Sequence, residues 1–149
     1  MDRESQAHKN VSKNTKDARE KAILIGIEFS SSGPSPLDNN LKELNGLAET
    51  AHYNVIAVVS QKLTRINPKS FIGKGKVEEV AHLIRHFSAH IVIFDENLSP
   101  AQNRNLENIF KCRVIDRSWL ILEIFGNHAR TREAKAQVEL ASLKYALPR

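Results

Sequence analysis

The sequence predicts a small α/β domain, a mostly parallel four-stranded sheet with helices on both faces, and three observations support this fold class. Four short apolar runs rich in β-branched residues recur along the chain, at residues 22–27, 55–59, 91–94 and 114–115. These runs are continuous rather than alternating, which is typical of parallel strands buried on both faces. Between them lie segments with apolar residues three and four positions apart, which indicate crossover helices.

The first two helices are predicted from this spacing alone. Leucines recur from Leu37 to Leu47, ahead of Ala51, and predict a helix between the first two strands. A second set begins at Val77 and ends at Phe87, so we expect a helix that leads into the third strand. We also expect two loops, a turn-rich one at residues 30–36 and a long one at residues 60–72, and long loops in compact domains are often functional.

Capping residues predict where the next two helices begin. Ser99 precedes Pro100, which suits a first helical position, and Gln102 completes a capping box with Ser99. Asp116 directly follows the last strand and is expected to cap a fourth helix. The residues expected on the buried faces of these two helices are Leu106, Ile109, Phe110, Leu120, Ile121 and Ile124.

A last helix, predicted at about residues 131–147, carries two apolar stripes. A coiled-coil seam of Ala136, Leu140, Leu143 and Leu147 lies beside a stripe of Ala134, Val138, Ala141 and Tyr145. So broad an apolar face should be buried. Three arrangements satisfy this requirement: the helix folds back onto the sheet, pairs with a second copy of the chain, or packs against a partner helix beyond Arg149.

The composition excludes several classes of protein. Of the 149 residues, 41% are hydrophobic and 26% charged, which excludes global disorder, although the polar residues 1–21 are expected to form a disordered arm. No apolar run approaches the roughly 20 residues of a membrane span. The single cysteine, Cys112, cannot form an internal disulfide, so we expect a cytoplasmic protein. A net charge of +5 permits a polyanionic partner such as RNA but does not demand one.

A turn of alternating glycine and lysine, Gly73-Lys74-Gly75-Lys76, precedes the second helix. The glycines let a ligand approach the backbone, the helix N-terminus offers N–H groups to an anion, and the lysines add positive charge. A plain basic turn and a phosphate or RNA contact are equally expected from these residues alone. Residues 61–90 hold six Lys or Arg against two Glu, and this local excess of positive charge supports the contact.

Other polar residues leave alternatives open. His82 and His86 have a spacing that suits a metal, but no further ligand completes the set, and we assign no metal site. Asp95 and Glu96 follow the third strand, where they either contact magnesium or a ribose or serve loop solvation and capping. No nucleophile–base pair is recognisable, so no catalytic residue is assigned. Five arginines have two interpretations: they either contact RNA or pair with nearby carboxylates. These arginines are Arg104, Arg113, Arg117, Arg130 and Arg132.

Taken together, several motifs resemble the N-terminal domain of HflX-type GTPases. They begin with FIGKGKVEE at residues 71–79 and IFDENLSPAQNRNLE at residues 93–107. They continue with VIDRSWLILEIF at residues 114–125, ARTRE at residues 129–133 and QVELASLKYALPR at residues 137–149. Because these segments occur in matching order over nearly everything after the arm, the resemblance is specific although no single motif is.

The resemblance implies a ribosome-associated protein of several parts. An α/β domain, here residues 22–128, would precede a long helical hairpin, whose truncated first helix would be residues 129–149, and then a GTPase domain. Family members bind the large ribosomal subunit and its rRNA, and some have ATP binding and RNA remodelling attributed to this region. The resemblance implies GTP and magnesium only for a full-length member, no required cofactor for this chain, and ATP as a further candidate ligand.

We therefore expect an rRNA-binding domain that acts on the large ribosomal subunit and is not catalytic alone, with a GTPase domain in cis if the chain is part of a longer protein. Two alternatives stay open: an interaction module that pairs through its C-terminal helix, and an ATP-dependent RNA-remodelling domain. The expected nucleotide or RNA contacts are Gly73, Lys74, Gly75, Lys76, Arg104, Arg117, Arg130 and Arg132.

Overall fold

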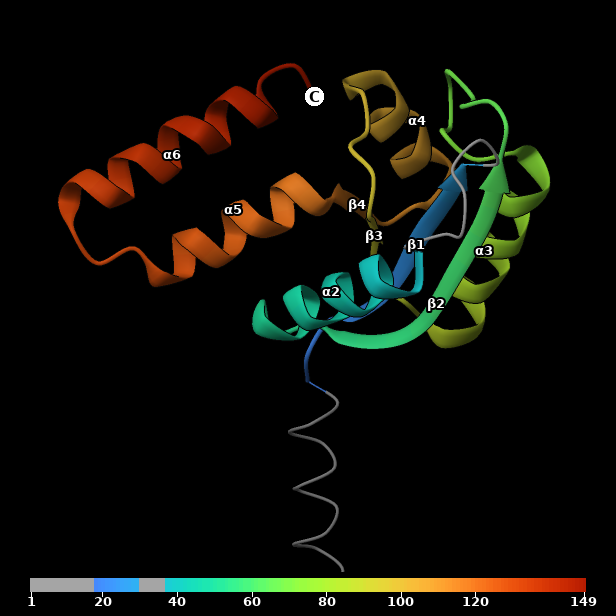
Figure 1. Ribbon diagram of the computed structural model, residues 1–149, viewed down its shortest axis with the longest axis horizontal. Helices are drawn as coiled ribbons and strands as arrows, with labels where there is room; N and C mark the ends of the chain where they lie inside the picture. Colours follow the sequence, from blue (N-terminus) through green and yellow to red (C-terminus); the bar gives the residue numbers. More distant parts are fainter. Residues whose placement is uncertain (1–17, 30–36) are drawn as a thin grey trace, which may run out of the picture.

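The computed structural model describes residues 18–29 and 37–149, and strands and helices alternate along them (Figure 1). The elements are β1 (Lys21–Phe29), α2 (Leu37–Thr50), β2 (Asn54–Leu63), α3 (Lys74–Phe87), β3 (Ile91–Phe94), α4 (Pro100–Phe110), β4 (Arg113–Asp116), α5 (Arg117–His128) and α6 (Arg132–Ala146). The arm expected at residues 1–21 lies mostly outside the described residues, and the loop expected at 30–36 lies wholly outside them. Residues 18–21 of the expected arm are described, and Lys21 is the first residue of β1 rather than the last of an arm.

The sheet confirms the predicted fold class. Its strands run in the order β2-β1-β3-β4, and every neighbouring pair is parallel. In this order the chain leaves β1 toward one edge for β2 and then crosses to the other side for β3 and β4. The carboxyl ends of β1 and β3 therefore form the point at which the winding reverses, where ligands of such sheets bind.

Two hydrophobic cores enclose the sheet, because successive residues of a buried strand point to opposite faces. Ile23 and Ile25 of β1 face α3 and α4, whereas Ala22 and Leu24 face α2 and α5. All four side chains are fully buried. Continuous apolar runs thus arise from burial on both faces, as the sequence predicts.

Strand β2 departs from that prediction. It lies at an edge of the sheet, so Val58 is 53% exposed, although residues 55–59 were expected to be buried on both faces. The strand also continues to Leu63, which shortens the predicted loop at residues 60–72. An extra residue, Ile56, interrupts the pairing with β1, since Val55 pairs with Ala22 and Ala57 with Ile23.

The helices begin at their predicted caps, but some residues that were predicted to be buried on their faces are exposed. Ser99 and Gln102 form the expected capping box, and the Asp116 side chain accepts a hydrogen bond from the Trp119 N–H. Ile109, however, was expected on the buried face of α4 and is 49% exposed, because the core reaches α4 only through its neighbours such as Leu106. Phe87, at the end of α3, is likewise 37% exposed.

Helix α6 folds back beside α5, and the two form an antiparallel pair that extends away from the sheet (Figure 1). The half-buried residues of α6 include Ala134, Val138 and Ala141, which belong to one of the two predicted stripes. The other stripe stays exposed, with Leu140 at 55% and Leu147 at 80%. The chain itself therefore covers one apolar stripe, while the hairpin expected from residue 129 onward stays a prediction.

No helix in the described part of the chain combines the length and the apolar character needed to cross a membrane.

Gly26 sets how closely α2 approaches the sheet, and we expect Gly26→Ala to destabilise the fold by about 1–3 kcal/mol through overpacking. A Cβ at this position would lie 2.6 Å from Leu41 Cδ2 and 2.9 Å from Leu37 Cδ1. Gly46 in α2 is the control: a Cβ there meets nothing within 4 Å, so Gly46→Ala should stabilise by about 0.5–1 kcal/mol. Urea denaturation measures both, and equal stabilities of the two variants would contradict the close approach.

Candidate functional site

The loop between β2 and α3, residues 64–73, is held in a fixed shape by its own hydrogen bonds. Asn67 and Phe71 exchange two backbone hydrogen bonds of 3.0 and 2.9 Å, and the Asn67 side chain accepts from the Lys69 N–H at 2.8 Å. Phe71 adopts a left-handed backbone with φ of 63°, and its buried ring meets Phe94 edge-on at 6.4 Å. The buried ring anchors the loop, and the exposed Lys69 stands at its turn.

Two side chains of α4 tie this loop to the rest of the carboxyl edge of the sheet. The Gln102 carboxamide accepts from the Ser99 N–H at 2.9 Å and donates to the Asn67 carbonyl at 2.9 Å, so one residue caps α4 and holds the loop. Asn105 donates to the Lys69 carbonyl at 3.1 Å. Because of these bonds, the loop and α4 form one continuous edge.

The glycine–lysine turn forms the beginning of α3. Gly73 is its N-cap and donates its own N–H to the Gln61 side chain at 3.2 Å. Gly75 is open, since a Cβ there would meet nothing within 4 Å. Lys76 pairs with Glu79 at 2.7 Å, whereas Lys74 is exposed and has no ion pair within residues 18–29 and 37–149. Lys74 is therefore the more available cation of this turn.

The structure does not bring the predicted arginines to one place. Arg104 of α4 donates to the Pro148 carbonyl at 2.8 Å, and Arg117 bridges Asp95 at 2.8 Å and Glu43 at 2.9 Å. Arg130 and Arg132 lie at the turn between α5 and α6, whereas α3 lies across the sheet from this turn (Figure 1). The predicted contact residues thus fall into separate groups, and Lys74 and Arg104 belong to the carboxyl edge.

At the carboxyl end of β3, an internal ion pair occupies one of the two acidic residues. Asp95 is 9% exposed and pairs with Arg117. Burial raises the pKa of Glu96, and the neighbouring Asp95 raises it further, while Arg117 opposes both effects. No group of three His, Cys, Asp or Glu that suits a metal occurs within the described ranges. His82 and His86, singled out for their spacing, lie side by side with ring centroids 6.3 Å apart.

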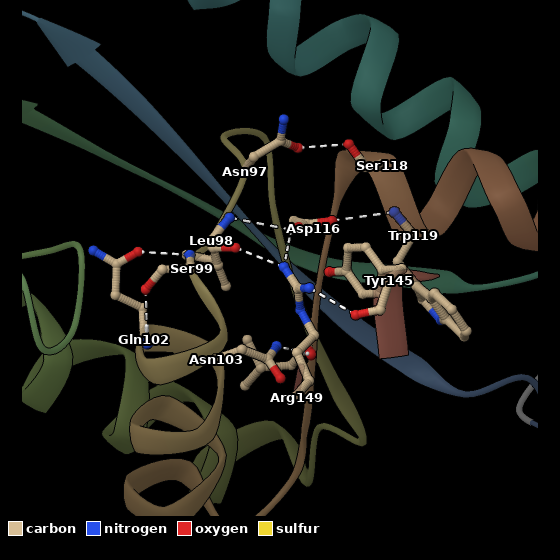
Figure 2. A network of polar contacts seen from close by, with 11 residues as sticks. Asn97, Leu98, Ser99, Gln102, Asn103, Asp116, Ser118, Trp119, Tyr145 and Arg149 are labelled. Carbon is tan, nitrogen blue, oxygen red and sulfur yellow. Dashed lines mark hydrogen bonds and ion pairs between the residues drawn. The ribbon is translucent and has the colours of Figure 1, made fainter. Parts of the chain in front are cut away.

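A buried carboxylate, Asp116, organises the polar contacts beside this point (Figure 2). It is fully buried at the end of β4, and its two oxygens accept from the Leu98 N–H and the Trp119 N–H, each at 3.1 Å. The sequence predicts its role as a helix cap. The bond to the loop before α4 has no local sequence signal, because it depends on the pairing of β3 with β4.

The same carboxylate attracts Arg149, which lies just beyond α6 (Figure 2). The guanidinium is 3.8 Å from Asp116 and donates to the Leu98 carbonyl at 2.7 Å and the Tyr145 carbonyl at 2.8 Å. It also lies 3.6 Å above the Tyr145 ring, and that ring stacks on Trp119 at 5.1 Å. Burial and then the nearby Asp116 raise the pKa of Tyr145, against the effect of Arg149. The contacts to Leu98, Asp116 and Trp119 hold the end of α6 against the α/β domain.

Comparison with protein families places this architecture among known proteins. The family described as "GTP-binding GTPase N-terminal" matches residues 38–126. GTPase HflX of Escherichia coli is 42% identical over 133 residues, which cover 89% of this chain and 30% of that protein. GTPase HflX of Methanocaldococcus jannaschii is 44% identical over 110 residues, which cover 74% of this chain and 27% of that protein. The chain thus spans about 30% of the length of the curated relatives it matches.

Solved structures agree with the sequence comparison. A GTP-binding protein from the archaeon Sulfolobus solfataricus in complex with GDP matches with a TM-score of 0.66 and 30% identity. The match covers 87% of this chain and 37% of that protein. A structure described as an SsGBP and GDP complex matches with a TM-score of 0.70 and 30% identity, over 87% of this chain and 36% of that one.

Replacement of the buried carboxylate should be costly, and we expect Asp116→Ala to lower the free energy of unfolding by about 3 kcal/mol. The variant loses the cap of α5, leaves the Leu98 N–H unpaired and removes the anion near Arg149. Glu139→Ala, an exposed change on α6, should alter stability by less than about 0.5 kcal/mol. Guanidinium titration compares them, and a loss below about 1 kcal/mol for Asp116→Ala would show that the network is dispensable.

Proposed function

Because the chain belongs to the HflX family and matches the GTP-binding GTPase N-terminal domain, we propose that it binds RNA of the large ribosomal subunit. The proposed contact surface is the carboxyl edge of the sheet on the side of α3 and α4. It contains the loop at residues 64–73, the first turn of α3 and the exposed side of α4.

The observation that carries this proposal is the pair of exposed lysines on a fixed support. Lys69 stands on a loop tied to α4 by Asn105 and Gln102, and Lys74 opens α3 without an ion pair in the described part of the chain. A helix N-terminus adds partial positive charge next to Lys74. Because the backbone that carries these lysines is already fixed, little loop freedom is lost on binding, which favours contacts to the phosphates of RNA.

A purine nucleotide is the second candidate ligand of the same turn. Gly75 leaves open space beside Lys74, so a phosphate group has access to the first turn of α3. GTP with magnesium is a different case, because the pattern G-x-x-x-x-G-K-[ST] that cradles its phosphates occurs nowhere in the 149 residues. We therefore assign GTP binding to none of these residues. Equilibrium dialysis with ATP tests the second candidate, and retention that Lys74→Ala leaves unchanged would exclude this turn.

The double change Lys69→Ala and Lys74→Ala should weaken binding to purified large ribosomal subunits about tenfold. Each lost phosphate contact should make the dependence of log affinity on log salt less steep by about 1. The double change Lys42→Ala on α2 and Lys135→Ala on α6 is the matched control, because it also removes two positive charges, both from exposed positions away from α3 and α4. Co-sedimentation at several salt concentrations measures both effects. Equal affinities and salt slopes for the double variant and the control would refute this contact surface.

A further inference from the structure

We propose that the end of α6, residues 145–149, is a releasable strap, and that RNA phosphates release it by competing for Arg104 and Arg149. In the docked state these two arginines hold the strap against the carboxyl edge. In the released state they face the ligand together with Lys69 and Lys74. This inference rests on the proposed RNA binding and adds to it a conformational change of α6.

The docked strap is held mainly through backbone carbonyls. Arg104 donates to the carbonyl of Pro148, and Arg149 donates to the carbonyl of Leu98, whereas the bond from Arg149 to the Tyr145 carbonyl lies within the strap itself. Its distance to the Asp116 carboxylate is longer, at 3.8 Å. A phosphate binds a guanidinium through two charge-assisted hydrogen bonds and is a stronger acceptor than a neutral carbonyl. Phosphate can therefore replace the partners that hold the strap.

The docked state also leaves two polar atoms without partners. The Tyr145 hydroxyl and Arg149 Nε are buried, and neither makes a hydrogen bond in the structure. Such atoms disfavour the state that buries them, and release of the strap exposes both to water. Tyr145 and Arg149 thus both hold the strap in place and carry the unpartnered atoms that favour its release.

Among the residues that the structure describes, little else fixes α6 in place. None of its residues is fully buried, and the leucines of its outer stripe, Leu140 and Leu143, are about half exposed or more. Its remaining contacts are made by the half-buried stripe that packs on α5. Segments with few buried contacts open locally at free energies well below that of global unfolding.

Position links the strap to the proposed RNA surface. Helix α4 contacts both segments, because Asn105 donates to the Lys69 carbonyl of the loop at residues 64–73 and the preceding Arg104 donates to the Pro148 carbonyl of the strap. Arg149 reaches Leu98, directly before the capping residue of α4. A ligand that pairs with these arginines only in the released state must shift the equilibrium toward release.

Trp119 provides a reporter for the strap, since it is the single tryptophan of the sequence and stacks on Tyr145. With the 149-residue chain, we would compare acrylamide quenching of Trp119 and amide exchange of α6 in Arg149→Ala and Arg132→Ala. Each variant loses one arginine at an end of α6, since Arg132 is the first residue of the helix and Arg149 lies just beyond its last residue, but Arg132 makes no ion pair within the described residues. Arg149→Ala should speed α6 exchange about tenfold and increase quenching. Arg132→Ala should change neither, and β3 exchange should stay constant in both.

Tyr145→Phe tests the opposing contribution. It keeps the ring on Trp119 and removes the unpartnered hydroxyl, so α6 exchange should slow relative to the unaltered chain. Faster exchange in Tyr145→Phe, or equal quenching in Arg149→Ala and Arg132→Ala, would overturn the strap.

A 20-nucleotide single-stranded poly(U) is the probe for release. At saturation it should speed α6 exchange and increase quenching of Trp119, and 0.5 M salt should abolish both changes. Binding of poly(U) with no change in α6 would refute the release while leaving the proposed RNA binding intact. Absence of binding at low salt, by contrast, would refute both the RNA contact and its coupling to α6, even if Arg149→Ala still frees the helix.

Discussion

The buried carboxylate of Asp116 constrains how the second half of the molecule is assembled. A carboxylate without contact to water must receive hydrogen bonds, and this one receives them from the loop before α4 and from the first turn of α5. It thereby fixes where β4 ends, where α5 begins and how the end of β3 turns into α4. The attraction of Arg149 to the same group extends this constraint to α6.

Much of the fold could be predicted from the sequence, because the determining interactions are local. Continuous apolar runs placed β1, β3 and β4, and side-chain caps placed the starts of α4 and α5 within a residue. The prediction was wrong where position in the sheet decides the outcome. Val58 belongs to a run as apolar as the others, yet β2 lies at an edge, and no local pattern tells an edge strand from a central one.

The candidate site was predicted less completely than the fold. Glycine and lysine composition located the first turn of α3, and the structure shows Lys74 exposed there while Lys76 pairs with Glu79. Arg117 and Arg104 were both predicted as contact residues, but Arg117 pairs with two carboxylates from distant segments, Glu43 and Asp95. Contacts of this kind depend on how the layers meet, so the sequence could not separate a structural arginine from one available to a ligand.

The irregularity in β2 has a consequence for solubility. Within residues 18–29 and 37–149, no strand pairs with the outer edge of this ten-residue strand, and a regular edge of that length is a template on which another chain can add a strand and start aggregation. The extra residue at Ile56 breaks the even spacing of free N–H and C=O groups near one end, and Lys62 places a charge near the other. Both features disfavour the addition of a strand from another chain at this edge.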